Sequence, residues 1–184
     1  MNVRFTIAGN SRKLRFYHCI PFLKKVEKMV GFGYDVHRLA AGESLVLGGI
    51  AIESELGTVA HSDGDVLLHA VCDALLGAAG LGDIGEHFPD TDAAFKNRAS
   101  TYFLENVMSL LKKEGYRLIN LDCTLVLERP KILPYKPAIR ESIATVCGLS
   151  VKRVSLKATT SEKVGFVGRG EGVEAYCVCE IQPE

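Results

Sequence analysis

Apolar and polar positions recur along the chain with distinct periods, and these periods predict where helices and strands lie. Residues 65–79 are apolar on almost every face, which predicts a buried helix. Residues 100–114 are amphipathic with the helical repeat, and residues 137–147 form a third predicted helix. In residues 117–127 apolar and polar side chains alternate, as in a strand with one buried face. Each predicted helix is closed by a glycine, namely Gly80, Gly115 and Gly148.

The remaining pattern predicts further strands and one long loop. Strands are expected at residues 30–36, 154–158 and 173–181, and a hairpin at residues 44–52. Residues 82–92 are rich in acids and turn formers and are expected to form a loop. Strands and helices mix without a strict β-α-β rhythm. We therefore expect an α+β fold with a single sheet and helices packed on one face.

Length and composition fit one globular domain with a real core, since the chain has 184 residues and 47% hydrophobic content. No stretch approaches the roughly 18–20 apolar residues that span a membrane, so no membrane partner is expected. The net charge is zero but uneven: residues 1–28 hold seven basic residues and one acid, and the other 156 hold 15 basic and 21 acidic residues. This acidic body argues against nucleic-acid binding.

Residues 1–28 look like a different kind of sequence, basic and without clear periodicity. A transit peptide to a plastid-type organelle is one interpretation, although Ser11 is the only serine there. A secretory signal is disfavoured because no uninterrupted apolar region ends in small residues. We favour Met29 as the natural start, with residues 1–28 as an N-terminal extension, residues 29–184 as the domain, and a cytoplasmic location.

The six cysteines form no CxxC pair. Cys177 and Cys179 share one face of a predicted strand, which favours core thiols over metal ligands. This usage is typical of an intracellular protein rather than of a disulfide framework.

One group of polar residues predicts a metal site. Asp35 and His37 stand two apart at a strand end, so both side chains point to the same face. His69 lies on the predicted buried helix, where Asp65 and Asp73 share its stripe. Two histidines and one carboxylate would hold zinc with one position open for catalysis, and either helix aspartate could orient a ligand histidine. The alternative is a buried histidine bonded to a carboxylate beside a polar strand end.

The start of the same helix has features of an anion site. Ser62 precedes Asp65 by three residues, which resembles a capping arrangement. Free backbone N–H groups at a helix start attract anions, and His61 beside the cap could donate to a phosphate. The alternative is simply a well-capped helix.

Two later loops are candidates for phosphate and nucleotide contacts. Residues 157–170 place three hydroxyls (Thr159, Thr160, Ser161) and Glu162 before a glycine-rich turn, a plausible site for phosphate and Mg²⁺, although the P-loop order is absent. Residues 128–134 combine two prolines with Arg129 and Lys131 in a stiff loop that could face a base and a phosphate. A polar turn and an exposed connector are the respective alternatives.

Four stretches together resemble the 2-C-methyl-D-erythritol 2,4-cyclodiphosphate synthase family, the cyclases of the non-mevalonate isoprenoid pathway. They are GYDVHRL (33–39), HSDGDVLLHAVCDALLGAAGLGDIGEHFPDTD (61–92), ERPKILPY (128–135) and KATTSEKVGFVGRGEG (157–172). The stretches stand in the family's order and spacing, and the resemblance covers residues 29–184. One departure is Thr160-Ser161 where three threonines are common, a change that keeps the hydroxyl.

The resemblance implies a role for each stretch. Asp35, His37 and His69 would bind one Zn²⁺ per subunit, and Glu162 would bind Mg²⁺ or Mn²⁺. His61 and Thr160 would act in catalysis by stabilising the transition state around the phosphates. The implied substrate contacts are Asp35, Val36, His37, His61, Ser62, Asp83, Ile84, Gly85, Phe88, Pro89, Asp90, Thr91, Asp92, Arg129, Pro130, Lys131, Ile132, Leu133, Pro134, Tyr135, Thr159, Thr160, Ser161, Glu162, Phe166 and Arg169.

These implied contacts divide by the part of the substrate they would meet. Residues 83–85 would hold sugar or methylerythritol hydroxyls, and residues 88–92 would form a flexible lid. Residues 129–135 would cradle cytosine through the main chain, and residues 159–162 would bind the diphosphate. Phe166 and Arg169 would lie near the substrate end or a trimer axis.

The resemblance also implies an assembly and a reaction. Family members are homotrimers with active sites between neighbouring subunits. The implied reaction is an intramolecular phosphoryl transfer, in which a 2-phosphate attacks the β-phosphate of a CDP group and CMP leaves; this would make the chain a phosphorus–oxygen lyase. The alternatives are a zinc-dependent phosphohydrolase, a non-enzymatic trimeric module with structural zinc, and a bifunctional cytidylyltransferase, for which 184 residues leave no room.

Overall fold

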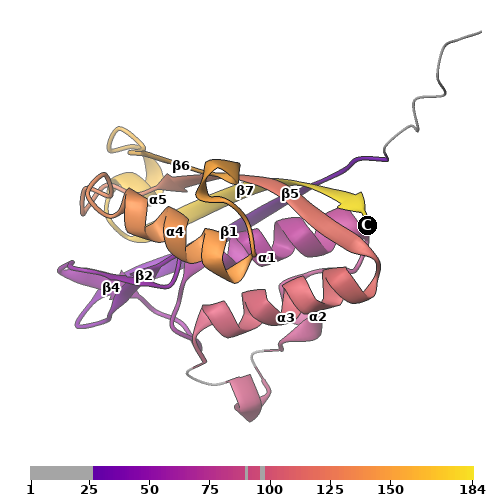
Figure 1. The fold of residues 1–184 in the computed structure, drawn as a ribbon. Coiled ribbons are helices and arrows are strands. Elements are labelled where there is room, and N and C mark those ends of the chain that lie inside the picture. Colours follow the sequence, from indigo (N-terminus) through magenta and orange to yellow (C-terminus); the bar gives the residue numbers. More distant parts are fainter. Residues whose placement is uncertain (1–26, 90, 96–97) are drawn as a thin grey trace, which may run out of the picture.

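A mixed five-stranded sheet forms the centre of the structure, with the strand order β4-β1-β7-β5-β6 (Figure 1). Neighbouring strands run antiparallel except β5 and β6, which are parallel. The strands are β1 (Met29–Ala41), β4 (Leu56–Thr58), β5 (Tyr116–Val126), β6 (Val154–Thr159) and β7 (Gly172–Pro183). The computed structural model describes residues 27–89, 91–95 and 98–184, so the predictions for residues 1–26 and for Asp90 lie outside it.

Three helices pack on one face of this sheet (Figure 1). α1 lies against β1 and β7, α3 lies against α1, and α4 lies against β6. The helices are α1 (Val66–Ala79), α3 (Ser100–Lys113) and α4 (Lys136–Val146). Leu75, Leu104 and Leu125 are fully buried between these helices and the sheet. The predicted α+β class, with helices on one face, is therefore confirmed.

The expectation of a single sheet is wrong in one detail. β2 (Leu45–Leu47) and β3 (Ile50–Ile52) form the predicted hairpin, but they pair only with each other, as a separate two-stranded sheet. Gly48 and Gly49 connect them with φ of 62° and 77°, the left-handed conformation that a two-residue hairpin turn requires.

The segment predicted as a loop is partly helical. It contains α2 (Ile84–His87) and is followed by the 3₁₀ turn η1 (Ala93–Phe95). A second 3₁₀ turn, η2 (Val151–Arg153), and the short helix α5 (Gly165–Gly168) precede and follow β6. Among the described residues, no helix is both long and apolar enough to cross a bilayer.

A bulge interrupts the predicted alternation in β5. The pairing register with β7 shifts between Leu118 and Asn120. Strict alternation would place Leu118 on the face of Asn120, opposite Leu121. The extra residue of a bulge changes this, and both Leu118 and Leu121 are buried. The predicted face of Leu118 is therefore wrong.

Two glycines in β1 let α1 approach the sheet closely. A Cβ atom on Gly31 would lie 1.8 Å from the carbonyl oxygen of Ala74, and one on Gly33 would lie 2.0 Å from that of Ala70. Only glycine permits this contact. The close approach brings the first turn of α1 beside the strand segment that follows Gly33, where the polar residues of the candidate site lie.

Candidate active site

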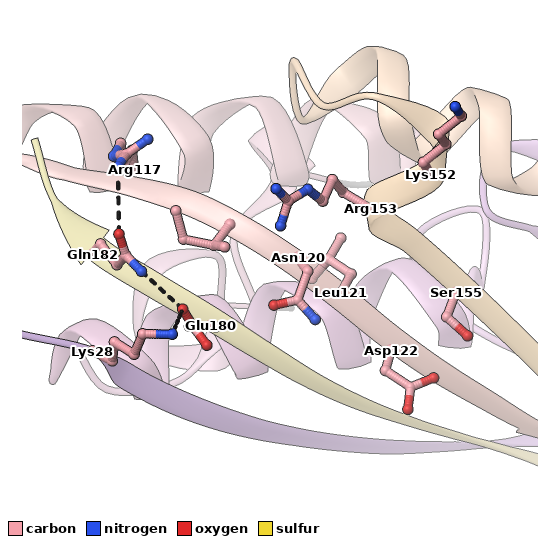
Figure 2. Close-up of a pocket in the computed structure, with 11 residues that line it drawn as sticks. Lys28, Arg117, Asn120, Leu121, Asp122, Lys152, Arg153, Ser155, Glu180 and Gln182 are labelled. Atoms are coloured by element: carbon pink, nitrogen blue, oxygen red, sulfur yellow. Dashed lines mark hydrogen bonds and ion pairs between the residues drawn. The ribbon is translucent and has the colours of Figure 1, made fainter. Parts of the chain in front are cut away.

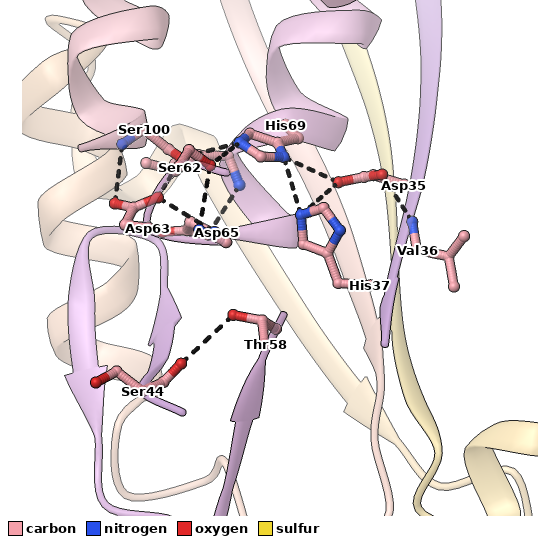
Figure 3. A network of polar contacts seen from close by, with 12 residues as sticks. Asp35, Val36, His37, Ser44, Thr58, Ser62, Asp63, Asp65, His69 and Ser100 are labelled. Carbon is pink, nitrogen blue, oxygen red and sulfur yellow. Dashed lines mark hydrogen bonds and ion pairs between the residues drawn. The ribbon is translucent and has the colours of Figure 1, made fainter. Parts of the chain in front are cut away.

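Three side chains from β1 and α1 converge at one point (Figure 3). Asp35 Oδ2 lies 3.0 Å from His69 Nδ1 and 3.4 Å from His37 Nε2. The two ring nitrogens are 3.2 Å apart. Each side chain keeps a part of its surface exposed, so the cluster is open on one side. The predicted juxtaposition of Asp35 and His37 with His69 is therefore confirmed.

The spacing of these three atoms fits a metal ion. Ligands about 2.0–2.1 Å from a tetrahedral zinc ion lie about 3.3 Å from one another. The observed separations of 3.0, 3.2 and 3.4 Å surround that value. A carboxylate oxygen and two imidazole nitrogens are also ligand types that zinc accepts. The triad can therefore hold a metal ion without moving its main chain.

The two histidines differ in their protonation. Burial lowers the pKa of His37 and outweighs the attraction of Asp35. Burial also lowers the pKa of His69, but the hydrogen bond with Asp35 and the neighbouring carboxylates outweigh it, so the net pKa is raised. His37 is therefore already neutral in a larger fraction of molecules and can bind a metal directly. In a larger fraction of molecules, a metal must first displace a proton from His69.

The start of α1 differs from the predicted capping arrangement. The N-cap is Asp65 rather than Ser62: Asp65 Oδ1 accepts the N–H of Leu68 at 3.0 Å, and Oδ2 accepts that of Gly49 at 2.6 Å. Asp65 is fully buried, and burial raises its pKa to about 6. It ties the β2–β3 hairpin to α1.

Neither helix aspartate hydrogen-bonds a ligand histidine, so that prediction is wrong. Asp65 contacts backbone N–H groups, and Asp73 accepts the N–H of Ile84 at 2.8 Å. Instead, the Ser100 hydroxyl lies 2.9 Å from His69 Nε2, the ring nitrogen that does not face Asp35. Ser100 and its partner Asp63 were not predicted, because the contact joins two helix starts that are 31 residues apart.

A hollow of about 500 Å³ opens beside the triad. Eight residues from the predicted set line it, namely His37, His61, Ser62, His69, Ile84, Gly85, Phe88 and Pro89. Phe95 and Phe103 complete one wall, and the ring centroids of Phe88 and Phe103 are 5.0 Å apart. Phe95 and Phe103 were not predicted as site residues. The only signal in the sequence is the apolar face of the amphipathic helix that carries Phe103.

The other residues predicted near the triad have different positions. Val36 points its side chain to the opposite face of β1, and only its N–H contacts Asp35 Oδ1, at 2.8 Å. Asp83 is the N-cap of α2, where its Oδ1 accepts the N–H of Glu86. Thr91 and Asp92 are exposed in the turn after Pro89. Of the predicted lid, only Phe88 and Pro89 among the described residues line the hollow.

The predicted phosphate loop is exposed and held by one acid. Glu128 Oε1 accepts the Ser161 N–H at 3.0 Å, the Ser161 hydroxyl at 3.1 Å and the Lys163 N–H at 3.1 Å. Glu162 and Lys163 are both left-handed, with φ of 53° and 64°. Thr160 donates its hydroxyl to Glu162 at 2.9 Å. Glu128 was not predicted as a site residue, although it directly precedes the predicted base loop.

The predicted base loop is grouped with the phosphate loop rather than with the triad. Arg129, Pro130 and Lys131 line a hollow of about 830 Å³ with Thr160 and with residues 53–56. A smaller neighbouring hollow is lined by residues that include Ile132, Leu133 and Thr159. Tyr135 is the N-cap of α4, preceded by Pro134. No residue of the triad lines either hollow.

Phe166 and Arg169 line none of the three hollows described above. Phe166 is in α5, and Arg169 directly follows it. The Phe166 ring lies close to the main chain of β1, because a Cβ atom on Gly172 would be 2.9 Å from that ring and 3.1 Å from the carbonyl oxygen of His37. Arg169 forms two hydrogen bonds with the Glu171 carboxylate, each of 2.8 Å. The predicted residues that do line hollows form two separate groups, one beside the triad and one beside Glu128.

A further hollow of about 780 Å³ lies on the face of the sheet opposite α1 (Figure 2). Lys28 pairs there with Glu180 at 3.1 Å, and Arg117 donates to Gln182 at 3.4 Å. None of the predicted site residues that the structure describes lines this hollow. It is therefore separate from the candidate active site.

Comparison with known proteins identifies relatives of this architecture. Residues 28–182 match the model of the YgbB family. The 2-C-methyl-D-erythritol 2,4-cyclodiphosphate synthase of Symbiobacterium thermophilum is 60% identical over 83% of this chain and 98% of its own length. The synthase of Syntrophotalea carbinolica is 54% identical over 81% of this chain and 91% of its own length.

Solved structures are similar too. The bifunctional IspDF from Campylobacter jejuni has a TM-score of 0.84 and 42% identity, over 86% of this chain and 43% of that longer chain. IspF of Plasmodium falciparum, solved as a CDP complex, has a TM-score of 0.75 and 31% identity, over 85% of this chain and 97% of its own.

Proposed function

The chain belongs to the YgbB family of 2-C-methyl-D-erythritol 2,4-cyclodiphosphate synthases, and from this membership we infer the reaction that it catalyses. It converts 4-diphosphocytidyl-2-C-methyl-D-erythritol 2-phosphate to 2-C-methyl-D-erythritol 2,4-cyclodiphosphate and releases CMP, in the non-mevalonate route to isoprenoids. The observation that carries this conclusion is the 60% identity to a named synthase over nearly its whole length. We place the reaction at the triad and in the open hollow beside it.

We propose that Asp35, His37 and His69 hold one Zn²⁺ ion per subunit. The donor types and their separations of 3.0–3.4 Å support this assignment. Three protein ligands leave a fourth position that a phosphate oxygen of the substrate would occupy. When bound, the ion would supply positive charge to the phosphate groups that must approach one another.

In this proposal the hollow beside the triad receives the methylerythritol part of the substrate. His61 and Ser62 line it and would donate to phosphate oxygens. Residues 83–85 would hold hydroxyl groups, and residues 88–92 would close over the substrate. The aromatic wall of Phe88 and Phe103 supports this, because apolar walls exclude the water that would compete with cyclisation.

The exposed loops would receive the nucleotide part. Residues 129–135 would contact cytosine through the main chain, and Thr159, Thr160 and Ser161 would donate hydroxyls to the diphosphate. Glu162 would bind Mg²⁺ or Mn²⁺ and release the Thr160 hydroxyl, which it accepts in the free protein. The cytosine and diphosphate regions lie on neighbouring hollows, which supports a single nucleotide site. Phe166 and Arg169 are proposed to lie near the substrate end or a symmetry axis.

We propose a homotrimer with active sites between neighbouring subunits. Two observations support it. The metal group and the nucleotide group line separate hollows of one chain, so a neighbouring copy would have to complete each site. The sheet face opposite α1 also exposes apolar side chains that a second copy would cover, namely Val30, Phe32, Tyr34, Val36 and Val178.

The proposed mechanism needs positioning more than side-chain chemistry. The 2-phosphate oxygen attacks the β-phosphorus, and the bond from that phosphorus to the oxygen of CMP breaks, so the enzyme would be a phosphorus–oxygen lyase. Both reacting groups belong to one substrate, so holding its two ends removes the entropic cost of bringing reactants together. His61 and Thr160 would stabilise the charge that develops on the phosphate oxygens.

The proposal is tested by phosphorus NMR of the purified protein with substrate, Zn²⁺ and Mg²⁺. We expect one CMP and one cyclic diphosphate for each substrate consumed. A linear phosphate product would favour the rival zinc-dependent phosphohydrolase, in which the open metal position activates water. Zinc binding without any turnover would favour a structural role of the metal. We propose a cytoplasmic location, or a plastid-type organelle if residues 1–28 act as a transit peptide.

A further inference from the structure

The outer nitrogen of His69 faces the start of α3 (Figure 3). Ser100, the first residue of α3, is fully buried, and its Oγ lies 2.9 Å from His69 Nε2. The same hydroxyl donates to Asp63 Oδ1, while Asp63 Oδ2 accepts the Ser100 N–H at 2.9 Å. A continuous chain of hydrogen bonds thus runs from Asp63 through Ser100 to His69.

The number of protons in this chain determines its direction. A serine hydroxyl has one proton, and an ionised carboxylate can only accept. Because the Ser100 proton points to Asp63, the lone pairs of its oxygen can only accept a proton from His69 Nε2. A neutral imidazole has one N–H group. With that proton on Nε2, Nδ1 faces Asp35 and His37 and can bind a metal ion. In the metal-free protein Asp35 Oδ2, 3.0 Å from Nδ1, is a second acceptor for a His69 proton.

Asp63 is held as an acceptor by its surroundings. Its two oxygens meet the Ser100 hydroxyl, the Ser100 N–H and, at 3.3 Å, the Asp65 N–H. Its own N–H donates to the carbonyl of Arg98. Three donors therefore reach the Asp63 carboxylate, and one of them is the Ser100 hydroxyl, whose proton points to Asp63 rather than to His69.

A second hydroxyl near His69 does not have this property. Ser62 Oγ lies 3.5 Å from His69 Nε2, at the limit of a hydrogen bond, and accepts the N–H of Gly64 at 3.2 Å. No carboxylate in the described contacts takes its proton, so it can either donate to His69 or accept from it. Of these two hydroxyls, only that of Ser100 is restricted to accepting the Nε2 proton of His69.

We propose that Asp63 and Ser100 are positioning residues, which accept the Nε2 proton of His69 and so hold its Nδ1 toward the metal. This inference rests on the proposed metal site. The hydrogen-bond partner of a ligand histidine commonly sets its tautomer and orientation, and its loss typically weakens metal binding by about 10- to 100-fold. Here the partner comes from a different helix, so the start of α3 becomes a part of the metal site.

The first test replaces Ser100 by alanine. Two quantities are measured: the dissociation constant for Zn²⁺, by competition with a chromophoric chelator, and the rate at which the His69 Nε2–H proton exchanges with solvent, by ¹H–¹⁵N NMR of the zinc-loaded protein. We expect a dissociation constant about 10- to 100-fold higher and an Nε2–H proton that exchanges faster than in the unmodified protein. Ser109→Ala is the matched control, because Ser109 is exposed on the same helix and bonds only the carbonyl of Glu105.

Asp63→Asn gives a sharper prediction. The amide oxygen can accept the Ser100 N–H only if its NH₂ group faces the Ser100 hydroxyl. The hydroxyl would then donate to His69 Nε2 and favour a proton on Nδ1, the nitrogen that the metal needs. We therefore expect weaker Zn²⁺ binding than in the Ser109→Ala control, and no slowly exchanging Nε2–H proton.

The outcomes separate this inference from the proposed function. If Ser100→Ala binds Zn²⁺ as tightly as the unmodified protein and its Nε2–H proton exchanges no faster, the positioning role is overturned while the metal site stands. If the unmodified protein itself does not bind Zn²⁺, both the metal site and this inference are overturned. A loss of affinity with unchanged Nε2–H exchange would also overturn the inference, because a general loosening of the fold would then explain the loss.

Discussion

The metal half and the nucleotide half of the candidate site are held by different means. Asp35, His37 and His69 come from a strand and a helix that pack tightly together, and their atoms already have the spacing of metal ligands. Thr160 and Glu162 lie in an exposed loop with left-handed residues, and one carboxylate, Glu128, fixes that loop. The first half is built before any ligand arrives, whereas the second must exchange internal contacts for ligand contacts.

This difference suggests a division of labour. A rigid half can hold a metal and the small phosphorylated alcohol in one geometry, which is what in-line phosphoryl transfer demands. An exposed half can admit and release a nucleotide without disturbing the core. A substitution in one half should therefore leave the binding properties of the other half unchanged.

The largest effect is expected from His69→Ala. Removing one of three ligands leaves two, too few for a stable zinc site, so bound Zn²⁺ and turnover should both be lost. The fold should persist, because the metal-free protein already has a complete core. Metal analysis, the NMR assay and circular dichroism measure the three quantities. A full zinc complement with normal turnover would refute the role of His69.

The rigidity of the metal half is tested by Gly33→Ala. The new Cβ would lie 2.0 Å from the carbonyl oxygen of Ala70, so α1 must move away from β1. We expect a loss of about 1–3 kcal/mol in the free energy of unfolding, together with weaker Zn²⁺ binding. Gly77→Ala is the control: its Cβ has only one neighbour, at 3.9 Å, and it should stabilise the helix by about 0.5–1 kcal/mol. Equal unfolding curves for both variants would contradict this account.

The pH dependence of Zn²⁺ binding should reveal the protonation of the metal half. The metal competes with a proton at His69, and the pKa of His69 is raised despite its burial. Zinc affinity should therefore fall as the pH drops, by about tenfold per unit below that pKa, and the fall should begin above the ordinary pKa of histidine. Calorimetric titrations between neutral and mildly acidic pH measure it. A flat profile in this range would show that His69 is not a ligand.

The smallest effect is expected in the nucleotide half, from Glu128→Ala. Without the carboxylate the loop of residues 160–163 loses three hydrogen bonds, so kcat/KM should fall by about 10- to 100-fold while Zn²⁺ affinity stays constant. Glu128→Gln keeps an oxygen in the position of Oε1 and should lose much less. If Glu128→Ala weakens zinc binding as much as turnover, the two halves are not independent.

Local patterns in the sequence were sufficient for most elements and for the metal triad. The period of apolar residues placed α1, α3 and α4 to within one residue, and β5, β6 and β7 to within two, because burial of one face imposes that period on the chain. The prediction for β1 ended five residues too early, and β4 was not predicted. Asp35 and His37 share a face by the geometry of any strand. His69 stands out because an otherwise apolar helix carries it.

Only the tertiary structure decided the features that depend on distant contacts. The bulge that turns Leu118 inward arises from the pairing of β5 with β7, and Ser100 meets His69 only because α3 packs on α1. Glu128 likewise reaches Ser161 across 33 residues. A serine or a glutamate at such positions has no local pattern that distinguishes it from a surface residue. The sequence determined which chemistry the chain carries, whereas packing determined which groups hold that chemistry in place, because a hydrogen bond between distant segments exists only after the segments have been brought together.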